Sequence, residues 1–205
     1  MHLSPDDLPP FRVRPIELAN AQVRLEPLRP EHGPDLFAIG QDEATWRYMP
    51  RPAFTDNVDA ARWVADRLNE VLAGTRVCYV IRRLADDTVA GFTCLYDFRR
   101  PERALEIGYT WLAPAACRSE VNTATKLLLL THCFETLGCR RVQFKTDARN
   151  LTSQRAIERL GATKEGTLRR HMVVHGTYQR DTVFYSLLPE EWPEVKTRLT
   201  HRLTT

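Results

Sequence analysis

The stretch from Leu105 to Gly161 constrains the fold most, because it reads strand, loop, helix, strand, loop, helix. Its first segment, Leu105–Leu112, is rich in β-branched and aromatic residues, and Pro114 ends it because proline cannot donate to a strand ladder. Arg141–Thr146 alternates polar and apolar residues, as a half-buried strand does. Each strand therefore leads into a helix N-terminus, where free backbone N–H groups can hold an anion.

Capping residues mark the two helices of this stretch. Residues 119–123 are well suited to an N-cap, and the pattern predicts a helix from Ala124 to Leu137 that Gly138 stops. The second helix is predicted to begin within residues 150–153 and to end at residues 160–161.

The remaining segments predict a mixed α/β sheet with one antiparallel hairpin on each side of the central stretch. The predicted hairpins are Val77–Arg83 with Val89–Tyr96, and Thr163–Val174 with Tyr178–Leu188. Other predicted elements are a strand at Val23–Glu26 and helices at residues 30–39, 42–49, 55–74 and from Pro189 onward. Residues 1–20 are polar and proline-rich, so we expect a mobile or draped arm before one domain, residues 21–205.

Composition narrows the function classes. The chain has 205 residues, of which 43% are hydrophobic and 27% charged, as in ordinary soluble globular proteins. A net charge of +3 permits an anionic ligand but does not indicate nucleic-acid binding. No apolar run reaches the roughly 18 residues of a membrane span, and the N-terminus does not read as a signal peptide. We expect no membrane partner.

The cysteines indicate a reducing compartment. There are five, an odd number, and none forms a Cys-x-x-Cys pair. Reduced thiols in a cytoplasmic protein fit this usage best, and no metal site is expected.

Several motifs in the right order resemble the GNAT family of N-acetyltransferases, over roughly residues 21–200. The resemblance lies in residues 122–123, 126–130, 134–138, 150–157 and 160–162. Residues 165–169, 181–186 and 191–192 are most similar to the branch that contains the ribosomal-protein alanine N-acetyltransferases. The resemblance implies a mostly antiparallel sheet flanked by helices, with acetyl-coenzyme A between the splayed fourth and fifth strands. The residues it implies for the cofactor are Trp111, Leu112, Ala113, Arg118, Ser119, Glu120, Val121, Asn122, Thr123, Asn150, Ser153 and Ala156.

The pyrophosphate loop departs from the family pattern Gln/Arg-x-x-Gly-x-Gly/Ala. Its six positions hold Cys117-Arg118-Ser119-Glu120-Val121-Asn122, with neither glycine. Glycine permits unusual backbone angles and close approach to a phosphate, and Glu120 adds a negative charge. Arg118 can offset this by contacting a phosphate. The missing glycines favour an alternative function, a GNAT-like binding module without catalysis.

Acetyl transfer to an amine needs a base and an acid. Glu106 lies within an apolar strand; it either faces solvent or, as the resemblance implies, removes a proton from the amine. The family commonly places a tyrosine acid where this chain has Ile157, and the ribosomal branch uses a serine near the helix start, which Ser153 matches. The plain alternative for Ser153 is an N-cap or first-turn residue. Asn150 either orients the cofactor or a water, as the resemblance implies, or simply caps the loop. We expect Thr152 to point away from the site.

The resemblance implies a primary amine as acceptor, which the sequence does not name; a protein N-terminus and small amines stay open. Trp46, Tyr48 and His171 are expected to contact it, whereas Trp63 is expected to pack. Lys126 and Thr125 are expected on the helix surface. Exposed strand edges are compatible with a homodimer.

Overall fold

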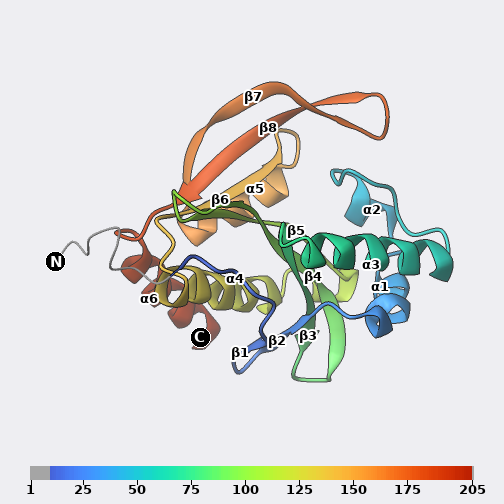
Figure 1. Ribbon diagram of the computed structural model, residues 1–205, viewed down its shortest axis with the longest axis horizontal. Coiled ribbons are helices and arrows are strands. Elements are labelled where there is room, and N and C mark those ends of the chain that lie inside the picture. The colour runs from blue at the N-terminus through green and yellow to red at the C-terminus, as the bar shows by residue number, and fades with distance from the viewer. Residues whose placement is uncertain (1–9, 205) are drawn as a thin grey trace.

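The computed structural model describes residues 10–204 and shows one eight-stranded sheet with helices on both faces (Figure 1). The strand order is β1-β2-β3-β4-β5-β6-β8-β7, and only the β5–β6 pair is parallel among these strands. The strands are β1 (Leu18–Ala19), β2 (Val23–Pro27), β3 (Arg76–Arg83), β4 (Thr88–Arg99), β5 (Ala104–Leu112), β6 (Arg141–Asp147), β7 (Thr163–Val174) and β8 (Tyr178–Leu187). The α-helices are α1 (Gly33–Ile39), α2 (Glu43–Trp46), α3 (Asn57–Leu72), α4 (Val121–Thr131), α5 (Leu151–Leu160) and α6 (Trp192–Thr204). Short 3₁₀ turns are η2 (Pro30–His32) and η3 (Pro114–Ala116), and a π-helical turn, η4 (His132–Thr136), follows α4.

The sheet separates two hydrophobic cores. In β3, Val77, Tyr79 and Ile81 point into the core that α4, α5 and α6 cover. Cys78 and Val80, the residues between them, point into the core under α1, α2 and α3. Alternate residues of a strand face opposite sides, so a strand that is apolar on both faces becomes a central strand.

The predicted α/β class and both predicted hairpins are confirmed, whereas the start of α4 is corrected. The helix begins at Val121 rather than Ala124, because the Ser119 hydroxyl accepts a hydrogen bond from the Val121 N–H at 3.3 Å. Gly138 ends the helical segment as predicted, with a left-handed φ of 61°.

Part of the predicted arm is packed against the sheet. Residues 1–9 lie outside the described chain. Among the described residues, Phe11 is buried in the core below α4, and Leu18 pairs with Leu25 to make β1, which sequence reasoning missed. The boundary at residue 20 stays a prediction.

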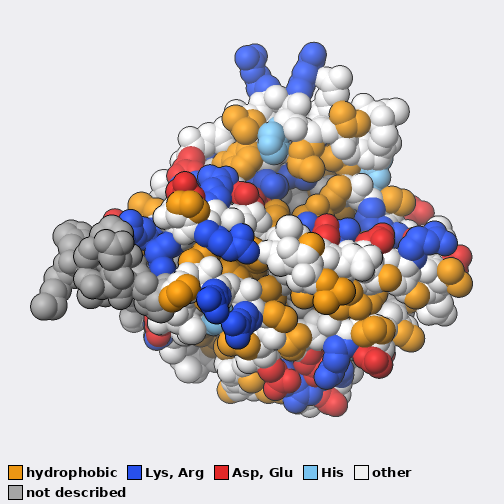
Figure 2. All heavy atoms as spheres, viewed as in Figure 1, with side chains coloured by type: hydrophobic (Ala, Val, Ile, Leu, Met, Phe, Trp, Pro, Cys, Tyr) orange, Lys and Arg blue, Asp and Glu red, His pale blue; other side chains and the backbone are white. Residues whose placement is uncertain are grey.

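The β7–β8 hairpin stands above the rest of the molecule, and Lys or Arg side chains project from its top (Figures 1 and 2). Pairing shifts between Leu168 and Met172, which leaves Arg169–His171 in a bulge. Arg170 has a left-handed φ of 51°, and its N–H donates to Asp181 Oδ1 at 2.7 Å. The bulge turns the hairpin's outer strand while Met172 stays paired with Arg180.

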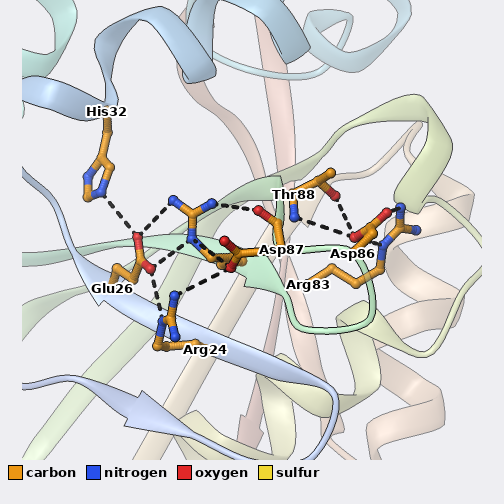
Figure 3. A network of polar contacts seen from close by, with 8 residues as sticks. Arg24, Glu26, His32, Arg83, Asp86, Asp87 and Thr88 are labelled. Atoms are coloured by element: carbon orange, nitrogen blue, oxygen red, sulfur yellow. Dashed lines mark hydrogen bonds and ion pairs between the residues drawn. The ribbon is translucent and has the colours of Figure 1, made fainter.

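A buried carboxylate ties β2 to β3 and η2 (Figure 3). Glu26 accepts hydrogen bonds from Arg82 Nε at 2.8 Å and Arg24 Nε at 2.9 Å. His32 Nδ1 accepts from the Arg29 N–H, so its Nε2 carries the proton that faces Glu26 Oε2 at 3.2 Å. Burial alone would raise the pKa of Glu26, but hydrogen bonds and charge from Arg82 and Arg24 lower it to about 2.

This network predicts a pH-dependent loss of stability in Glu26→Gln. The ionised carboxylate stabilises the fold above its ordinary pKa of 4.5, and this contribution disappears as pH falls towards 2. We expect the variant to be less stable by roughly 3 kcal/mol at pH 7, with the gap closing near pH 2. Urea unfolding at several pH values measures this difference in stability, with the substitution of an exposed residue, Glu31→Gln, as control. A gap that stays constant to pH 2 would assign the loss to packing instead.

Candidate functional site

The site begins where β5 and β6 part. Their parallel pairing runs from Ala104↔Arg141 to Glu106↔Gln143, and beyond these residues the strands diverge. This confirms the predicted splay, because β5 and β6 are the fourth and fifth strands when the two-residue β1 is not counted. A cavity of about 360 Å³ opens between the strands.

Most of the cavity lining comes from β5 from Ile107 onward, β6 around Lys145, the start of α4, the first turns of α5, and the segment at the end of α2. Tyr96 of β4, Met172 of β7 and Arg180 of β8 complete it. The lining residues used below are Tyr48, Tyr96, Gly108, Tyr109, Thr110, Trp111, Leu112, Cys117, Asn122, Lys126, Lys145, Asn150, Thr152, Ser153, Ala156, Ile157, Met172 and Arg180.

Glu106 lies at the point of divergence and does not face solvent. Its exposed fraction is 0%, which excludes the solvent-facing alternative. Its carboxylate accepts hydrogen bonds from the Tyr96 hydroxyl and from Gln143 Nε2 at 2.9 Å, and Lys145 Nζ lies 3.2 Å away. Burial, and then the charge of Glu106, raise the pKa of Tyr96, so this phenol remains a donor. A buried carboxylate is thus held by three partners next to the cavity.

A glycine and a bulge make room for this arrangement. A Cβ on Gly108 would lie 2.7 Å from the Tyr96 hydroxyl and 3.3 Å from Glu106 Oε1, so no larger residue fits. Immediately after it the register with β4 shifts, and Tyr109 takes a left-handed φ of 50°. The β-bulge carries Thr110 towards α4, where Lys126 Nζ donates to its hydroxyl at 2.7 Å.

The loop before α4 has the geometry of an anion site despite its missing glycines. Glu120 occupies a glycine position of the family pattern but has an ordinary helical φ of −68°, and it is exposed. The left-handed residue is instead Arg118, with φ of 61°. Ser119 accepts from the Val121 N–H, and within residues 10–204 the next two N–H groups, of residues 122 and 123, have no acceptor. Missing glycines therefore cause no backbone strain at position 120.

At the start of α5 the structure assigns capping to Asn150, which lines the cavity together with Ser153. Asn150 Oδ1 accepts from the Ser153 N–H at 3.0 Å, so Asn150 is the N-cap. The Ser153 hydroxyl has no hydrogen-bond partner within the described chain, and the residue lines the cavity beside Ile157. Thr152 also lines the cavity, contrary to expectation.

The other predicted residues divide into two groups. Trp111, Leu112, Asn122, Ala156 and Tyr48 line the cavity. Ala113 and Val121 are buried in the core, Arg118 and Glu120 are exposed on the loop, and Ser119 and Thr123 are partly buried there.

Two expectations about aromatic and basic residues are corrected. Trp46 is only 2% exposed, packs 5.0 Å from the Trp111 ring and donates its indole N–H to Gly40, so it supports the fold rather than contacting an acceptor. Lys126 and Thr125 are buried rather than on the helix surface; Lys126 is 5% exposed, and burial lowers its pKa to about 7. Trp63 packs in the same aromatic cluster, as expected.

His171 is exposed on the β7 bulge, outside the cavity lining, with its ring 5.3 Å from that of Phe184. Burial, and then the positive charges of Lys145 and Arg180, lower the pKa of His171. It therefore lies near the cavity's basic side chains rather than within the cavity.

The polar residues of the site that sequence reasoning missed include Tyr96, Tyr109, Lys145 and Arg180. Strand alternation placed Lys145 on the same face as Gln143, which is the face of Glu106. This alternation could therefore have identified Lys145 as a residue of the site. The bulge that positions Tyr109 leaves no comparable trace in the sequence.

Comparisons with known proteins agree with this geometry. The model of the acetyltransferase (GNAT) domain matches residues 22–163. The “Putative ribosomal N-acetyltransferase YdaF” of Bacillus subtilis is 35% identical over 109 residues, which cover 53% of this chain and 58% of that protein. The chain thus spans a little over half the length of the curated relatives it matches.

Solved structures match over nearly the whole chain. A GCN5-related N-acetyltransferase from Brucella melitensis has a TM-score of 0.88 and 28% identity, covering 95% of this chain and 88% of its own. Mycobacterium smegmatis RimJ in complex with CoA-disulfide shares the fold at 20% identity and a TM-score of 0.77, over 92% of this chain and 95% of its own. Among the described residues, no helix is long and apolar enough to cross a membrane. The matched domain covers most of the chain, and the chain therefore belongs to the GNAT acetyltransferase family.

Proposed function

We propose that this chain transfers an acetyl group from acetyl-coenzyme A to a primary amine, by direct transfer in a ternary complex. The observation that carries this is the buried Glu106 carboxylate at the point where β5 and β6 diverge, beside the cavity. A base there lies next to a space that both reactants can share, so no covalent enzyme intermediate is needed.

The residues present fit acetyl-coenzyme A, which supplies the acetyl group as a thioester. The unpaired N–H groups of Asn122 and Thr123 at the start of α4 suit the pyrophosphate, and Arg118 is exposed beside them. The diverging part of β5, with Trp111 and Leu112, and Ala156 of α5 suit the pantetheine arm. The coenzyme A complex of the RimJ relative supports this assignment.

Glu106 acts as the base. It accepts the proton that the amine nitrogen loses as that nitrogen bonds to the acetyl carbon, directly or through water. The Tyr96 hydroxyl and Gln143 Nε2 hold the carboxylate by hydrogen bonds, and Lys145 Nζ lies 3.2 Å from it, so its position beside the cavity is fixed. Ser153 acts as the acid: its hydroxyl, unpaired within the described chain, gives its proton to the sulfur as the C–S bond breaks and takes a proton back from water.

The loop geometry weakens the alternative of a binding module without catalysis. That alternative rested on the missing glycines, yet Glu120 needs no glycine-like backbone angle. Its exposed side chain leaves the N–H groups of the following turn accessible. We therefore favour a catalytic protein.

The name of one relative and the position of the cavity support two classes of acceptor. The ribosomal N-acetyltransferase name of the Bacillus subtilis relative supports a protein N-terminus, and small amines fit the same cavity. Tyr48 lies on the acceptor side, where the Arg149 guanidinium sits 5.9 Å from its ring and 3.4 Å from that of Tyr178.

Compartment and assembly belong to the same proposal. All five cysteines are free thiols, and Cys78 and Cys94 remain so with sulfur atoms 3.2 Å apart, which supports a cytoplasmic location. β7 is an edge strand that is exposed over most of its length, which supports a homodimer through this edge.

The role of Glu106 predicts a pH-dependent defect in Glu106→Gln. We expect acetyl transfer at pH 7 to fall about 100-fold or more, the range of general base catalysis. The loss should shrink above the amine's own pKa, near 8 for an α-amino group, because solution then removes the proton. A pH–rate profile measures this, with exposed Glu102→Gln as control. A loss of equal size at every pH would give Glu106 a positioning role.

The role of Ser153 predicts a loss of turnover without a loss of stability in Ser153→Ala. We expect turnover to fall by roughly 10²-fold, while the melting temperature holds, because Asn150 supplies the cap and alanine keeps the N–H it accepts from. Turnover, melting temperature and acetyl-coenzyme A binding are measured together. Unaltered turnover would retire Ser153 as the acid, and a loss confined to Thr152→Ala would transfer the role to Thr152.

A further inference from the structure

Arg180 of β8 is a buried cation that has no hydrogen-bond or ion-pair partner among the described residues. It is 6% exposed, it lines the cavity, and its Nε atom is buried with no hydrogen-bond acceptor in the described chain. No carboxylate among the described residues lies within ion-pair distance of it. Burial lowers the pKa of Arg180, and the nearby charge of Asp147 only partly opposes this. The site therefore holds a donor group that the described residues leave unsatisfied.

The charged side chains that line the cavity carry an excess of positive charge. The charged residues that line the cavity are Lys126, Lys145 and Arg180, all basic. Lys126 donates to Thr110, and Lys145 pairs with Glu106.

The carboxylate of Asp147, whose charge acts on Arg180, already has another partner. Asp147 accepts the Arg149 backbone N–H at 2.8 Å and faces its guanidinium at 3.4 Å. Within the described part of the site, the Arg180 Nε atom thus has no hydrogen-bond acceptor and its guanidinium has no ion-pair partner.

The position of Arg180 assigns it to the acceptor rather than to the cofactor. Glu106 pairs with Gln143, and Gln143 with Ser186, so these three side chains share one face of the sheet. Arg180 lies an even number of residues from Ser186 along β8 and belongs to the same face. Phe144, on the opposite face, packs in the core that α4 and α5 cover, and the proposed pyrophosphate site is at the start of α4.

We propose that Arg180 binds a carboxylate carried by the acceptor, so that the preferred substrate is an amine with an acidic group close to its nitrogen. This rests on the proposed acetyl transfer. A guanidinium binds a carboxylate with two parallel hydrogen bonds, and it does so most strongly where water is excluded. The carboxylate has two sources: the α-carboxylate of a free amino acid, or an acidic side chain near a peptide N-terminus.

If Arg180 served only the stability of the fold, its substitution would have a different effect. An unpaired buried charge costs stability, so a residue kept for the fold would have a partner or be apolar. Arg180→Met should therefore raise the melting temperature, by about 2 °C or more, while it impairs use of acidic acceptors. A lower melting temperature with unaltered acceptor preference would show that Arg180 serves the fold, and would overturn the proposal.

Matched acceptor pairs test the proposal with the full chain and acetyl-coenzyme A. The pairs are alanine with alaninamide, and tripeptides beginning Ala-Glu with tripeptides beginning Ala-Gln. We expect wild type to favour the acidic member of at least one pair by tenfold or more in kcat/KM. Arg180→Gln should reduce that ratio to near one through a higher KM for the acidic acceptor, with the KM for acetyl-coenzyme A unchanged. A preference in the first pair alone identifies the α-carboxylate, and one in the second pair alone the side chain.

Controls separate this proposal from the proposed acetyl transfer. Arg62→Gln removes the same charge from an exposed position of α3 and should keep the wild-type preference. Arg180→Lys keeps the charge and should retain part of the preference for the acidic acceptor. It is the variant to use if Arg180→Gln folds poorly. Acetylation of both members at equal rates by wild type, or an unchanged preference in Arg180→Gln, would overturn the carboxylate proposal alone. If wild type acetylates no amine in the panel, the proposed function itself is wrong.

Discussion

The pairing of β5 with β6 ends at Glu106 and Gln143, and the rest of the site depends on this early end. Backbone N–H and C=O groups that leave a sheet need other partners, because burying them unpaired is costly. Between two diverging strands, a ligand with an amide-rich chain can supply those partners. The same early end places the Glu106 carboxylate beside the space instead of under a continuous sheet.

The two hydrophobic cores hold the strands apart. On one face Phe144 of β6 packs with Ile157 and Leu160 of α5, which ties the diverging β6 to its own helix. On the other face Trp111 of β5 packs with Trp46 of α2. Each strand is thus fixed from a different side, so the cavity is part of the folded structure. A preformed site of this kind spends less binding free energy on ordering the protein.

The sequence predicts the order of helices and strands well because each of them depends on a local sequence pattern. Strand alternation, capping residues and glycine stops lie within a few positions of one another, as in Asn150 capping α5 and Gly138 ending the segment after α4. β1 was missed because two residues are too few for a pattern, and α4 begins early because the Ser119 hydroxyl already accepts from the Val121 N–H.

The site is less predictable because its contacts join distant residues. Glu106 reads as either exposed or buried until Gln143, 37 positions away, and Tyr96 are known to hold it. Lys126 looks like a surface lysine on its helix, but the bulge in β5 brings Thr110 to it. Polar residues can be buried where other strands supply hydrogen-bond partners, and a single sequence does not show which distant residues come into contact.

Amide hydrogen exchange with and without acetyl-coenzyme A tests the central claim most directly, since that claim is that the ligand occupies the gap between β5 and β6. The account predicts slower exchange of the amides of Ile107–Leu112 and of Asn122 and Thr123 when the ligand is added. The β2–β3 pairing, far from the gap, should exchange at an unchanged rate. Equal exchange of the β5 and α4 amides with and without saturating acetyl-coenzyme A would contradict the account.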